Sequence, residues 1–282
     1  MSQEKRTSPG TLYIVATPIG NLEDITLRGL RILKEVDLIA AEDTRHSKKL
    51  LNHYGIKTSL ISYYREKEQQ RASQLLEKLH GGQDIALISD AGTPGISDPG
   101  AILVGRALDE SIRVVPIPGP SALTTALSAS GLTESSFCFL GFAPQKKSKR
   151  RKLLDSLVDA SLPLVFYESP HRIHHLLGDI HEILGNRDLF IGRELTKTHE
   201  ELKRGTAAEL LEQSLAGRNR GEFVVMIKPG IKVKKNSAED LDQSLLDYSD
   251  DGELSTKDII AKVSRELGLP RSQVYKRALE IL

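Results

Sequence analysis

Three loops rich in glycine and proline hold residues that could bind a small molecule. Each follows a short apolar run, and they read Thr17-Pro18-Ile19-Gly20-Asn21, Asp90-Ala91-Gly92-Thr93-Pro94-Gly95 and Pro118-Gly119-Pro120-Ser121-Ala122. Glycine permits positive φ and close approach of the backbone, whereas proline fixes φ, so these loops have defined shapes. One such loop alone is usually a tight turn between a strand and a helix. Three at the same edge of one sheet favour a ligand-binding site.

The chemistry of these loops narrows the ligand class. None reads G-x-x-x-x-G-K-[ST], and none is a G-x-G-x-x-G followed by an acidic residue about twenty positions later. The loops offer backbone N–H and C=O groups, small side chains and the carboxylate of Asp90. Such groups suit a neutral or partly cationic ligand with polar edges. S-adenosylmethionine, with an adenosine, a sulfonium and an amino-acid tail, fits this description.

A run of cations suggests a second kind of partner. Residues 145–152 read QKKSKRRK, in which six of eight residues are cations. Cations at the start of a helix oppose the helix dipole, so a phosphate partner explains the run better than a solvated helix face does. We expect RNA contact, with salt-sensitive binding, from Lys146, Lys147, Lys149, Arg150 and Arg151.

The elements that position these residues follow from the apolar pattern. Strand-length apolar runs alternate with helical periodicity, with strands expected at 12–16, 38–41, 59–62, 85–89 and 113–117. A second alternating block has strands near 136–140, 162–167, 188–192 and 223–228, and helices near 148–158, 170–184 and 206–215. Such alternation predicts a largely parallel sheet covered on both faces, with ligands beyond the carboxyl ends of its strands. The prediction is two α/β domains, at residues 11–118 and 119–230.

The chain changes character after Pro229. Residues 231–282 comprise a short basic linker, an acidic stretch without Lys or Arg at 237–254, and a segment that opens with the capping pattern Ser255-x-x-Asp258. Apolar stripes predict a three-helix unit with a helix-turn-helix at its end, its final helix capped by Ser272. These stripes are Leu241, Leu245 and Leu246, then Ile259, Ile260, Val263 and Leu267, then Val274, Ala278 and Leu282. Nucleic-acid contact and a purely structural or dimerisation role both stay open.

Composition excludes several classes of protein. Hydrophobic residues make up 39% and charged residues 27%, as in ordinary globular proteins, and the net charge of +1 confines any nucleic-acid contact to local patches. The single cysteine, Cys138, excludes an intrachain disulfide and fits a reducing cytosol. No apolar run approaches the roughly 20 residues of a membrane span, and the start lacks the apolar core of a signal peptide. We expect a cytoplasmic protein without membrane contact, with residues 1–10 as a disordered tail.

Four ordered motifs resemble a known family. They are VATPIGNLEDITLRGLRILKEVDLIAAEDTR, LISDAGTPGISDPG, VVPIPGPSALTTALSASGL and FYESPHR. Together they closely resemble the tetrapyrrole methylase superfamily, and within it the branch that methylates a cytidine 2′-hydroxyl of 16S ribosomal RNA in the decoding region. The resemblance runs from residue 11 to the end, and the tail is similar to that branch's helix-turn-helix domain. One stretch departs from it: after Tyr63, where a His/Asn-containing segment is usual, this chain reads Tyr64-Arg65-Glu66-Lys67-Glu68.

The resemblance implies a binding site for S-adenosylmethionine in the cleft between the two α/β domains. It also implies a homodimer, with small-subunit ribosomal RNA or the 30S subunit as partner. Carried over by position, the pocket would use Pro18, Asp90, Ala91, Gly92, Thr93, Ser121 and Ala122. The second domain would add Tyr167, Glu194, Leu195, Gly221 and Glu222. We expect main-chain groups from Ala91 to Thr93 to bind the polar edges of the donor.

Methyl transfer to a ribose hydroxyl needs more than a donor site. The reaction is an in-line displacement at carbon with the sulfonium as leaving group, so alignment supplies much of the rate. The hydroxyl is a poor nucleophile, and a base or a nearby cation should assist it. The motifs AEDTR and YESPHR offer Glu42, Asp43, Arg45, Glu168, His171 and Arg172.

Among these side chains we favour Glu168 as base or ribose ligand. Arg45 and Arg172 would place phosphates or polarise the hydroxyl, and Asp43 is a further catalytic candidate. The competing interpretation is an ion pair between Glu168 and Arg172 that caps the following helix.

Two other functions stay open on the sequence. The same fold and donor could serve a small molecule such as a tetrapyrrole precursor, but the cation run and a final segment with six Lys/Arg against three Asp/Glu argue against it. A helix-turn-helix regulator would bind duplex DNA with a defined half-site spacing and no donor turnover. Two long α/β domains make that function the weakest of the three.

Three histidines raise the question of a metal. His171, His174 and His175 have the spacing i, i+3 and i+4, but no carboxylate or cysteine at ligand spacing accompanies them. We therefore expect surface histidines and no metal.

Overall fold

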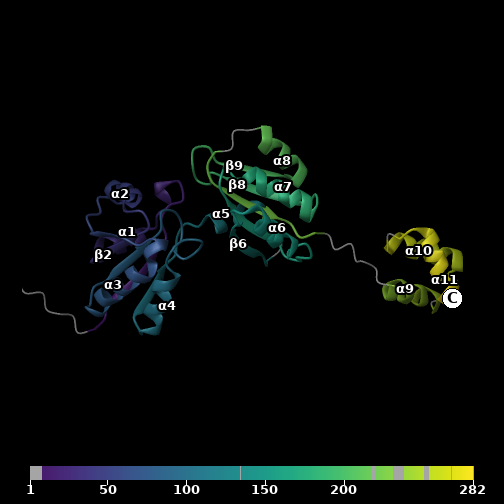
Figure 1. Cartoon of the computed structure of the whole chain (residues 1–282), viewed down its shortest axis with the longest axis horizontal. Helices are drawn as coiled ribbons and strands as arrows, with labels where there is room; N and C mark the ends of the chain where they lie inside the picture. Colours follow the sequence, from purple (N-terminus) through teal and green to yellow (C-terminus); the bar gives the residue numbers. More distant parts are fainter. Residues whose placement is uncertain are drawn as a thin grey trace, which may run out of the picture. The chain divides into compact units, whose positions relative to one another are not determined.

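The computed structural model describes residues 8–133, 135–216, 220–230, 238–250, 254–267 and 269–281. The chain forms two compact units, Met1–Pro229 and Gly230–Leu282 (Figure 1). Both predicted α/β sheets lie in the first unit. The boundary between two α/β domains at residues 118/119 therefore stays a prediction from the sequence. The linker 231–237 and most of the predicted tail lie outside the described residues. Gly10, the last residue of that tail, is buried and donates its N–H to the Leu79 carbonyl at 2.7 Å.

The first sheet is parallel throughout, with the strand order β3-β2-β4-β1-β5. Its strands are β1 (Thr11–Val15), β2 (Leu38–Ala41), β3 (Leu60–Ser62), β4 (Ile85–Ile88) and β5 (Arg113–Ile117). Its helices are η1 (Leu22–Asp24), α1 (Leu27–Glu35), α2 (Thr44–His53), η2 (Arg65–Lys67), α3 (Glu68–His80) and α4 (Ala101–Asp109).

Helices cover both faces of this sheet, as the sequence predicts. Leu33 of α1 and Leu51 of α2 pack on one face, whereas Leu75 of α3 and Leu103 of α4 pack on the other. Every residue of β4 is buried, which explains why this central strand reads as a continuous apolar run. The parallel order brings the carboxyl ends of the strands, and the loops that follow them, to one edge.

The second sheet is mixed, with the order β6-β7-β10-β8-β9. Its strands are β6 (Cys138–Phe142), β7 (Leu164–Glu168), β8 (Asp188–Arg193), β9 (Glu201–Thr206) and β10 (Phe223–Ile227). Its helices are α5 (Ala122–Ser130), α6 (Lys147–Asp155), α7 (Ile173–Leu184) and α8 (Ala207–Ala216). Only the β6–β7 pair is parallel, and the sequence missed β9. As a charged edge strand with a single large apolar residue, Leu202, β9 carries too little hydrophobic periodicity to be found.

The described residues of the second unit form three helices, olive green to yellow in Figure 1: α9 (Ala238–Asp250), α10 (Thr256–Leu267) and α11 (Arg271–Ile281). Its core is built from the predicted stripes: Leu241, Leu245, Ile259, Ile260, Val263, Val274 and Ala278. Ser255 receives the Asp258 N–H at 3.3 Å, as the capping pattern predicts. Leu246 is wrongly placed in the stripe, since it is 42% exposed. The final helix begins at Arg271, so Ser272 lies inside it, and Leu282 lies outside the described residues.

No helix in the described part of the chain is long and apolar enough to cross a membrane.

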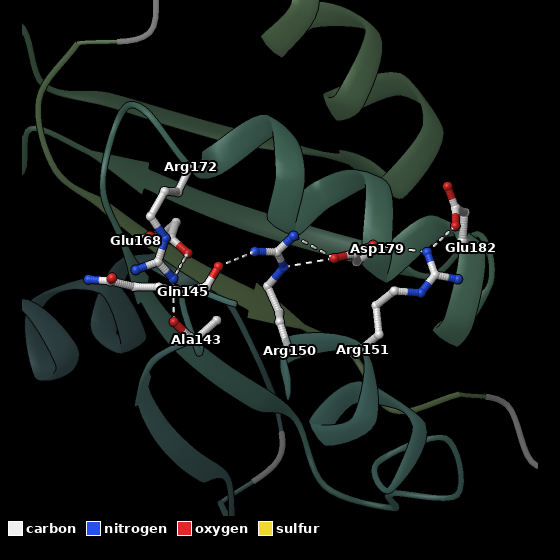
Figure 2. Close-up of polar contacts among 8 residues, drawn as sticks. All are labelled: Ala143, Gln145, Arg150, Arg151, Glu168, Arg172, Asp179 and Glu182. Atoms are coloured by element: carbon white, nitrogen blue, oxygen red, sulfur yellow. Dashed lines mark hydrogen bonds and ion pairs between the residues drawn. The ribbon is translucent and has the colours of Figure 1, made fainter. Parts of the chain in front are cut away.

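A buried ion pair joins α6 to α7 (Figure 2). The guanidinium of Arg150, which is only 4% exposed, contacts the equally buried Asp179 carboxylate at 2.7 Å. Arg151 reaches the other oxygen of Asp179 at 3.1 Å and also pairs with Glu182 near the surface. Burial makes this pair sensitive to the loss of either partner, because the remaining charge would have no counter-charge.

Removing the charge of Asp179 should therefore destabilise the first unit. We expect Asp179→Asn to lower its free energy of unfolding by about 3 kcal/mol, since Arg150 would stay buried without a counter-ion. Urea denaturation followed by circular dichroism measures this. Glu182→Gln, at the exposed end of the same network, is the matched control and should leave the midpoint unchanged. Equal midpoints for the two variants would contradict the assignment.

Candidate active site

A cavity of about 300 Å³ lies in the first unit where the carboxyl ends of β2, β4 and β7 meet the start of β10. That volume is at the lower end of the range for small-molecule sites. The first sheet and its loops contribute Ile19, Glu42, Asp90, Ala91, Gly92, Thr93, Ile96, Ser97 and Asp98. The second contributes Ser121, Ala122, Phe142, Tyr167, Glu168, Leu195, Glu222, Phe223 and Val224. The cavity therefore lies at the edge where the sequence places a ligand.

The beginning of the loop 89–100 is fixed by the loop after β1. Thr17 and Gly92 exchange both backbone hydrogen bonds, each at 2.9 Å, and the Thr17 hydroxyl donates to the Ser89 carbonyl at 3.0 Å. The Gly92 N–H is thus already paired and cannot bind a ligand, contrary to the prediction for residues 91–93. In the described structure the N–H groups of Ala91 and Thr93 donate no hydrogen bond, so these two remain for that role.

The end of the same loop is fixed by the stretch that departs from the family pattern. One carboxylate oxygen of Glu68 accepts the Gly100 N–H at 2.8 Å and the hydroxyl of the buried Tyr63 at 3.1 Å. Arg65 donates to the Ser97 carbonyl at 2.9 Å. Residues 64–68 therefore shape the pocket from outside.

Loops of the two sheets contact each other beside the cavity. A Cβ on Gly20 would lie 2.4 Å from Lys197 Cγ and 2.7 Å from the Thr196 hydroxyl, so only glycine fits there. The neighbouring Asn21 N–H donates to that hydroxyl at 3.1 Å. Three of the four non-glycine residues with positive φ in the described structure are in pocket loops: Ser97, Glu194 and Thr196. Such strain is typical of functional sites.

Tyr167 joins the second sheet to the start of α5. Its hydroxyl accepts the Leu123 N–H, one of the unpaired donors of the first helical turn, at 3.0 Å. Burial raises the pKa of this hydroxyl, so it stays a neutral group at the pocket wall. Its ring packs edge-on against Phe139 and Phe142, with centroids 4.9 and 5.7 Å apart.

The pocket is strongly acidic. Its described lining includes five carboxylates, from Glu42, Asp90, Asp98, Glu168 and Glu222, and no lysine or arginine. Burial, followed by the charges of Asp98 and Asp90, raises the pKa of Glu42 to about 7. Burial likewise raises the pKa of Asp98 to about 6, although the Ser89 hydroxyl partly offsets it. Such a site favours a cationic ligand.

Glu168, the favoured catalytic candidate, lines the cavity but is tightly held (Figure 2). One carboxylate oxygen accepts the Ser169 N–H at 2.8 Å and the other the Arg172 guanidinium at 3.1 Å. Arg172 also donates to the Ala143 carbonyl. Burial raises the pKa of Glu168 despite these donors. The ion pair of the competing interpretation is thus present in a pocket wall, but no side chain caps α7 at its N-cap residue, Arg172.

The structure places Asp43, a further catalytic candidate, outside the cavity lining. Its exposed carboxylate accepts the Arg45 N–H at 2.8 Å and so caps α2, and neither Asp43 nor Arg45 lines the cavity. The preceding residue, Glu42, lines it instead. The Asp43 N–H donates to the Asp90 carboxylate at 3.0 Å, which fixes this turn against the loop 89–100.

Most residues predicted to bind the donor line the cavity: Asp90, Ala91, Gly92, Thr93, Ser121, Ala122, Tyr167, Leu195 and Glu222. Pro18, Glu194 and Gly221 do not. Glu194 accepts the Glu222 N–H at 3.1 Å and pairs with Lys197 at 2.7 Å. A Cβ on Gly221 would lie 2.2 Å from Glu194 Cδ. These last two residues therefore support the wall behind Glu222.

The cation run divides into two groups. Lys146, Lys147 and Lys149 are exposed at the start of α6, where phosphates could reach them. Arg150 is wrongly included in the predicted RNA-binding set, because it is buried and neutralised by Asp179. Arg151 is half-exposed, with its guanidinium held by Asp179 and Glu182.

Several lining residues are not among the residues predicted from the sequence: Ile19, Ile96, Ser97, Asp98, Phe142, Phe223 and Val224. The first four lie within the quoted motifs, so position alone could have included them. Phe142, Phe223 and Val224 carry no such signal. Glu42 is a candidate of its motif in the sequence but not the favoured one. In the described residues no three His, Cys, Asp or Glu side chains are arranged to hold a metal ion.

Comparisons with known proteins agree with this geometry. Residues 11–211 match the family described as Tetrapyrrole (Corrin/Porphyrin) Methylases. Several proteins named ribosomal RNA small subunit methyltransferase I are similar over nearly their full length. The one from Halalkalibacterium halodurans is 47% identical (97% of this chain, 96% of the relative), and the one from Escherichia coli O157:H7 is 46% identical (99% and 98%).

Solved structures show the same fold at low sequence identity. Cobalt precorrin-4 methyltransferase superposes with a TM-score of 0.58 at 15% identity, covering 77% of this chain and 94% of that one. The methyltransferase CobJ gives 0.59 at 18%, covering 78% and 95%. The family model matches residues 11–211, and the two relatives match nearly the whole chain. This chain therefore belongs to the tetrapyrrole methylase family, in the branch of ribosomal RNA small subunit methyltransferase I.

Proposed function

We propose that the chain methylates the ribose 2′-hydroxyl of a cytidine in 16S ribosomal RNA, in the decoding region of the small ribosomal subunit. The family makes it a methyltransferase that uses S-adenosylmethionine. The observation that carries the proposal is the acidic cavity close to an exposed cationic helix start. Phe142 lines the cavity, and the first exposed lysine follows it by four residues.

The residues present fit the donor. When bound, S-adenosylmethionine supplies a methyl group on a positively charged sulfur. Five carboxylates without a lining lysine or arginine favour that charge and the donor's ammonium group. The free N–H groups of Ala91 and Thr93 suit the acceptor edges of an adenine or a carboxylate. Pro18, Glu194 and Gly221 would act by holding the loops.

The RNA would bind outside the acidic cavity. Lys146, Lys147 and Lys149 would contact phosphates, and Arg45 on the exposed start of α2 would add another contact. Glu168, with both oxygens already accepting hydrogen bonds, suits a ribose ligand better than a base. Arg172 then orients Glu168. A looped or single-stranded RNA is the form whose ribose can enter such a cavity.

Three further expectations remain proposals. The family resemblance supports a homodimer, which sedimentation of the purified chain tests. Cytoplasmic localisation and independence from metals rest on the same resemblance and on the sequence. Imaging of the tagged chain and activity after treatment with a chelator test them.

The proposed function predicts that the chain transfers a methyl group to 16S RNA. With tritiated donor and 30S subunits from cells lacking this protein, label should appear in a 2′-O-methylated cytidine of 16S RNA after nucleoside analysis. Subunits from wild-type cells, already modified, are the control. Donor binding without incorporation into RNA would instead favour a small-molecule acceptor such as a tetrapyrrole precursor.

The lysines at the start of α6 should set RNA affinity. Replacing Lys146, Lys147 and Lys149 together by Gln should raise KM for 30S subunits. It should also reduce the slope of log affinity against log salt by about one per lysine, since each phosphate contact releases a counter-ion. Donor affinity should not change. A variant with the exposed Lys34, Lys57 and Lys78 replaced is the control. An unchanged slope would contradict the assignment.

Glu68 should control donor affinity without touching the donor. Glu68→Ala leaves the Gly100 N–H and the Tyr63 hydroxyl without their acceptor, so the loop 89–100 loses its anchor. A buried N–H or O–H group left without an acceptor costs about 1–3 kcal/mol. We therefore expect the Kd for S-adenosylmethionine to rise about tenfold in calorimetry. Glu66→Ala, on the same turn but exposed, should have no effect. Equal affinities would refute the anchor.

A further inference from the structure

In the described structure three of the five pocket carboxylates, those of Glu42, Asp90 and Asp98, have no ion pair and could accept a proton, and Asp90 already accepts the Asp43 N–H. A carboxylate has about four acceptor sites. In the described structure Glu42 uses one of them, for the Asp90 N–H, and has no salt bridge. The carboxylate of Glu168 is held by Arg172 and Ser169, and that of Glu222 by Lys197 at 3.0 Å.

The backbone aims Glu42 into the cavity by register. β2 pairs with β4 in parallel, with Ala41 opposite Ile88, so the next residue lies beside the start of the loop 89–100. Side chains alternate along an extended chain, and the following Asp43 faces outward to cap α2. The Asp43 N–H bond to Asp90 then locks this turn to the loop.

We propose, on the basis of the proposed function, that Glu42 is the catalytic residue that takes the proton from the ribose 2′-hydroxyl. In this step the O–H bond breaks and its proton passes to the Glu42 carboxylate. The 2′-oxygen forms a bond to the methyl carbon as the carbon–sulfur bond breaks, and that electron pair stays on sulfur, leaving a neutral thioether. Charge balances, since one carboxylate and one sulfonium are both neutralised.

The surroundings of Glu42 suit a base that works near neutral pH. Asp98 and Asp90 face it from the loop 89–100, and Arg65 acts on it from η2. Glu168 and Glu222 line the same cavity from the second sheet. Burial and the two aspartates raise its pKa to about 7, against a smaller opposing effect of Arg65. A base is most effective when its pKa is close to the working pH.

The matched variants are Glu42→Gln, Asp98→Asn and Asp43→Asn. The first removes the base without changing shape. The second removes a negative charge beside Glu42, which should favour the ionised form and lower its pKa. The third changes a neighbouring carboxylate that faces away from the cavity and keeps its cap, because asparagine caps helices as well as aspartate does.

Single-turnover transfer to 30S subunits as a function of pH tests the proposal. In the wild type the rate should rise with pH through a limb near 7 as Glu42 loses its proton. Glu42→Gln should slow transfer at least ~100-fold and abolish the limb. Asp98→Asn should move the limb to lower pH, and Asp43→Asn should behave as the wild type.

Two measurements without turnover complete the test. In calorimetry Glu42→Gln should still bind S-adenosylmethionine, with a Kd that rises far less than the transfer rate falls, which also shows that the variant is folded. Infrared titration should reveal a carboxyl group that loses its proton near pH 7 in the wild type and is missing from Glu42→Gln.

Several results would overturn the proposal. If Glu42→Gln keeps the transfer rate and its rise with pH near 7, another group is the base. A donor Kd that rises by the factor by which the rate falls would make Glu42 a donor ligand. Failure of the proposed function is recognised separately, because the wild type itself would then transfer no label to RNA.

Discussion

The anchoring of the loop 89–100 is the constraint on which the site depends. This segment supplies much of the first-sheet wall of the cavity, yet it is rich in glycine, and glycine loses more conformational freedom on folding than any other residue. Groups outside the loop hold it along its length: the paired backbone of Thr17 and the Asp43 N–H near its start, and Arg65 and the Glu68 carboxylate toward its end. The cavity is thus formed before a ligand arrives, which reduces the ordering cost of binding.

The sequence predicts those parts of the fold that depend on order along the chain. Buried parallel strands are continuous apolar runs, and their carboxyl ends meet at one edge, so the first sheet and its ligand loops could be found without contacts. The edge strand β9 could not, because charged residues replace the apolar pattern there. The departure at residues 64–68 could be seen in the sequence, but its role as an anchor depends on hydrogen bonds from Gly100 and Ser97, about 32 residues later.

The sequence could not predict the direction in which side chains point. Glu42 and Asp43 are adjacent carboxylates after one strand, and only the capping of α2 decides which of them faces the cavity. Lys149 and Arg150 are adjacent cations of one helix. The buried Asp179 on α7, 29 residues further along, makes the second a structural residue and leaves the first exposed. In both pairs a tertiary partner, and not residue type, assigns the role.

The separation of charge then bears on how the proposed substrate enters. A cavity lined by five carboxylates repels RNA phosphates, whereas the exposed lysines at the start of α6 attract them. Burial, followed by repulsion from neighbouring carboxylates, raises the pKa of Glu42 and of Asp98, so the negative charge of the cavity is lower than its composition suggests. A nucleotide can contact the lysines and avoid repulsion by the cavity only when its phosphates stay outside and its ribose points inward. The electrostatics that favour a cationic donor therefore also orient the acceptor hydroxyl toward it.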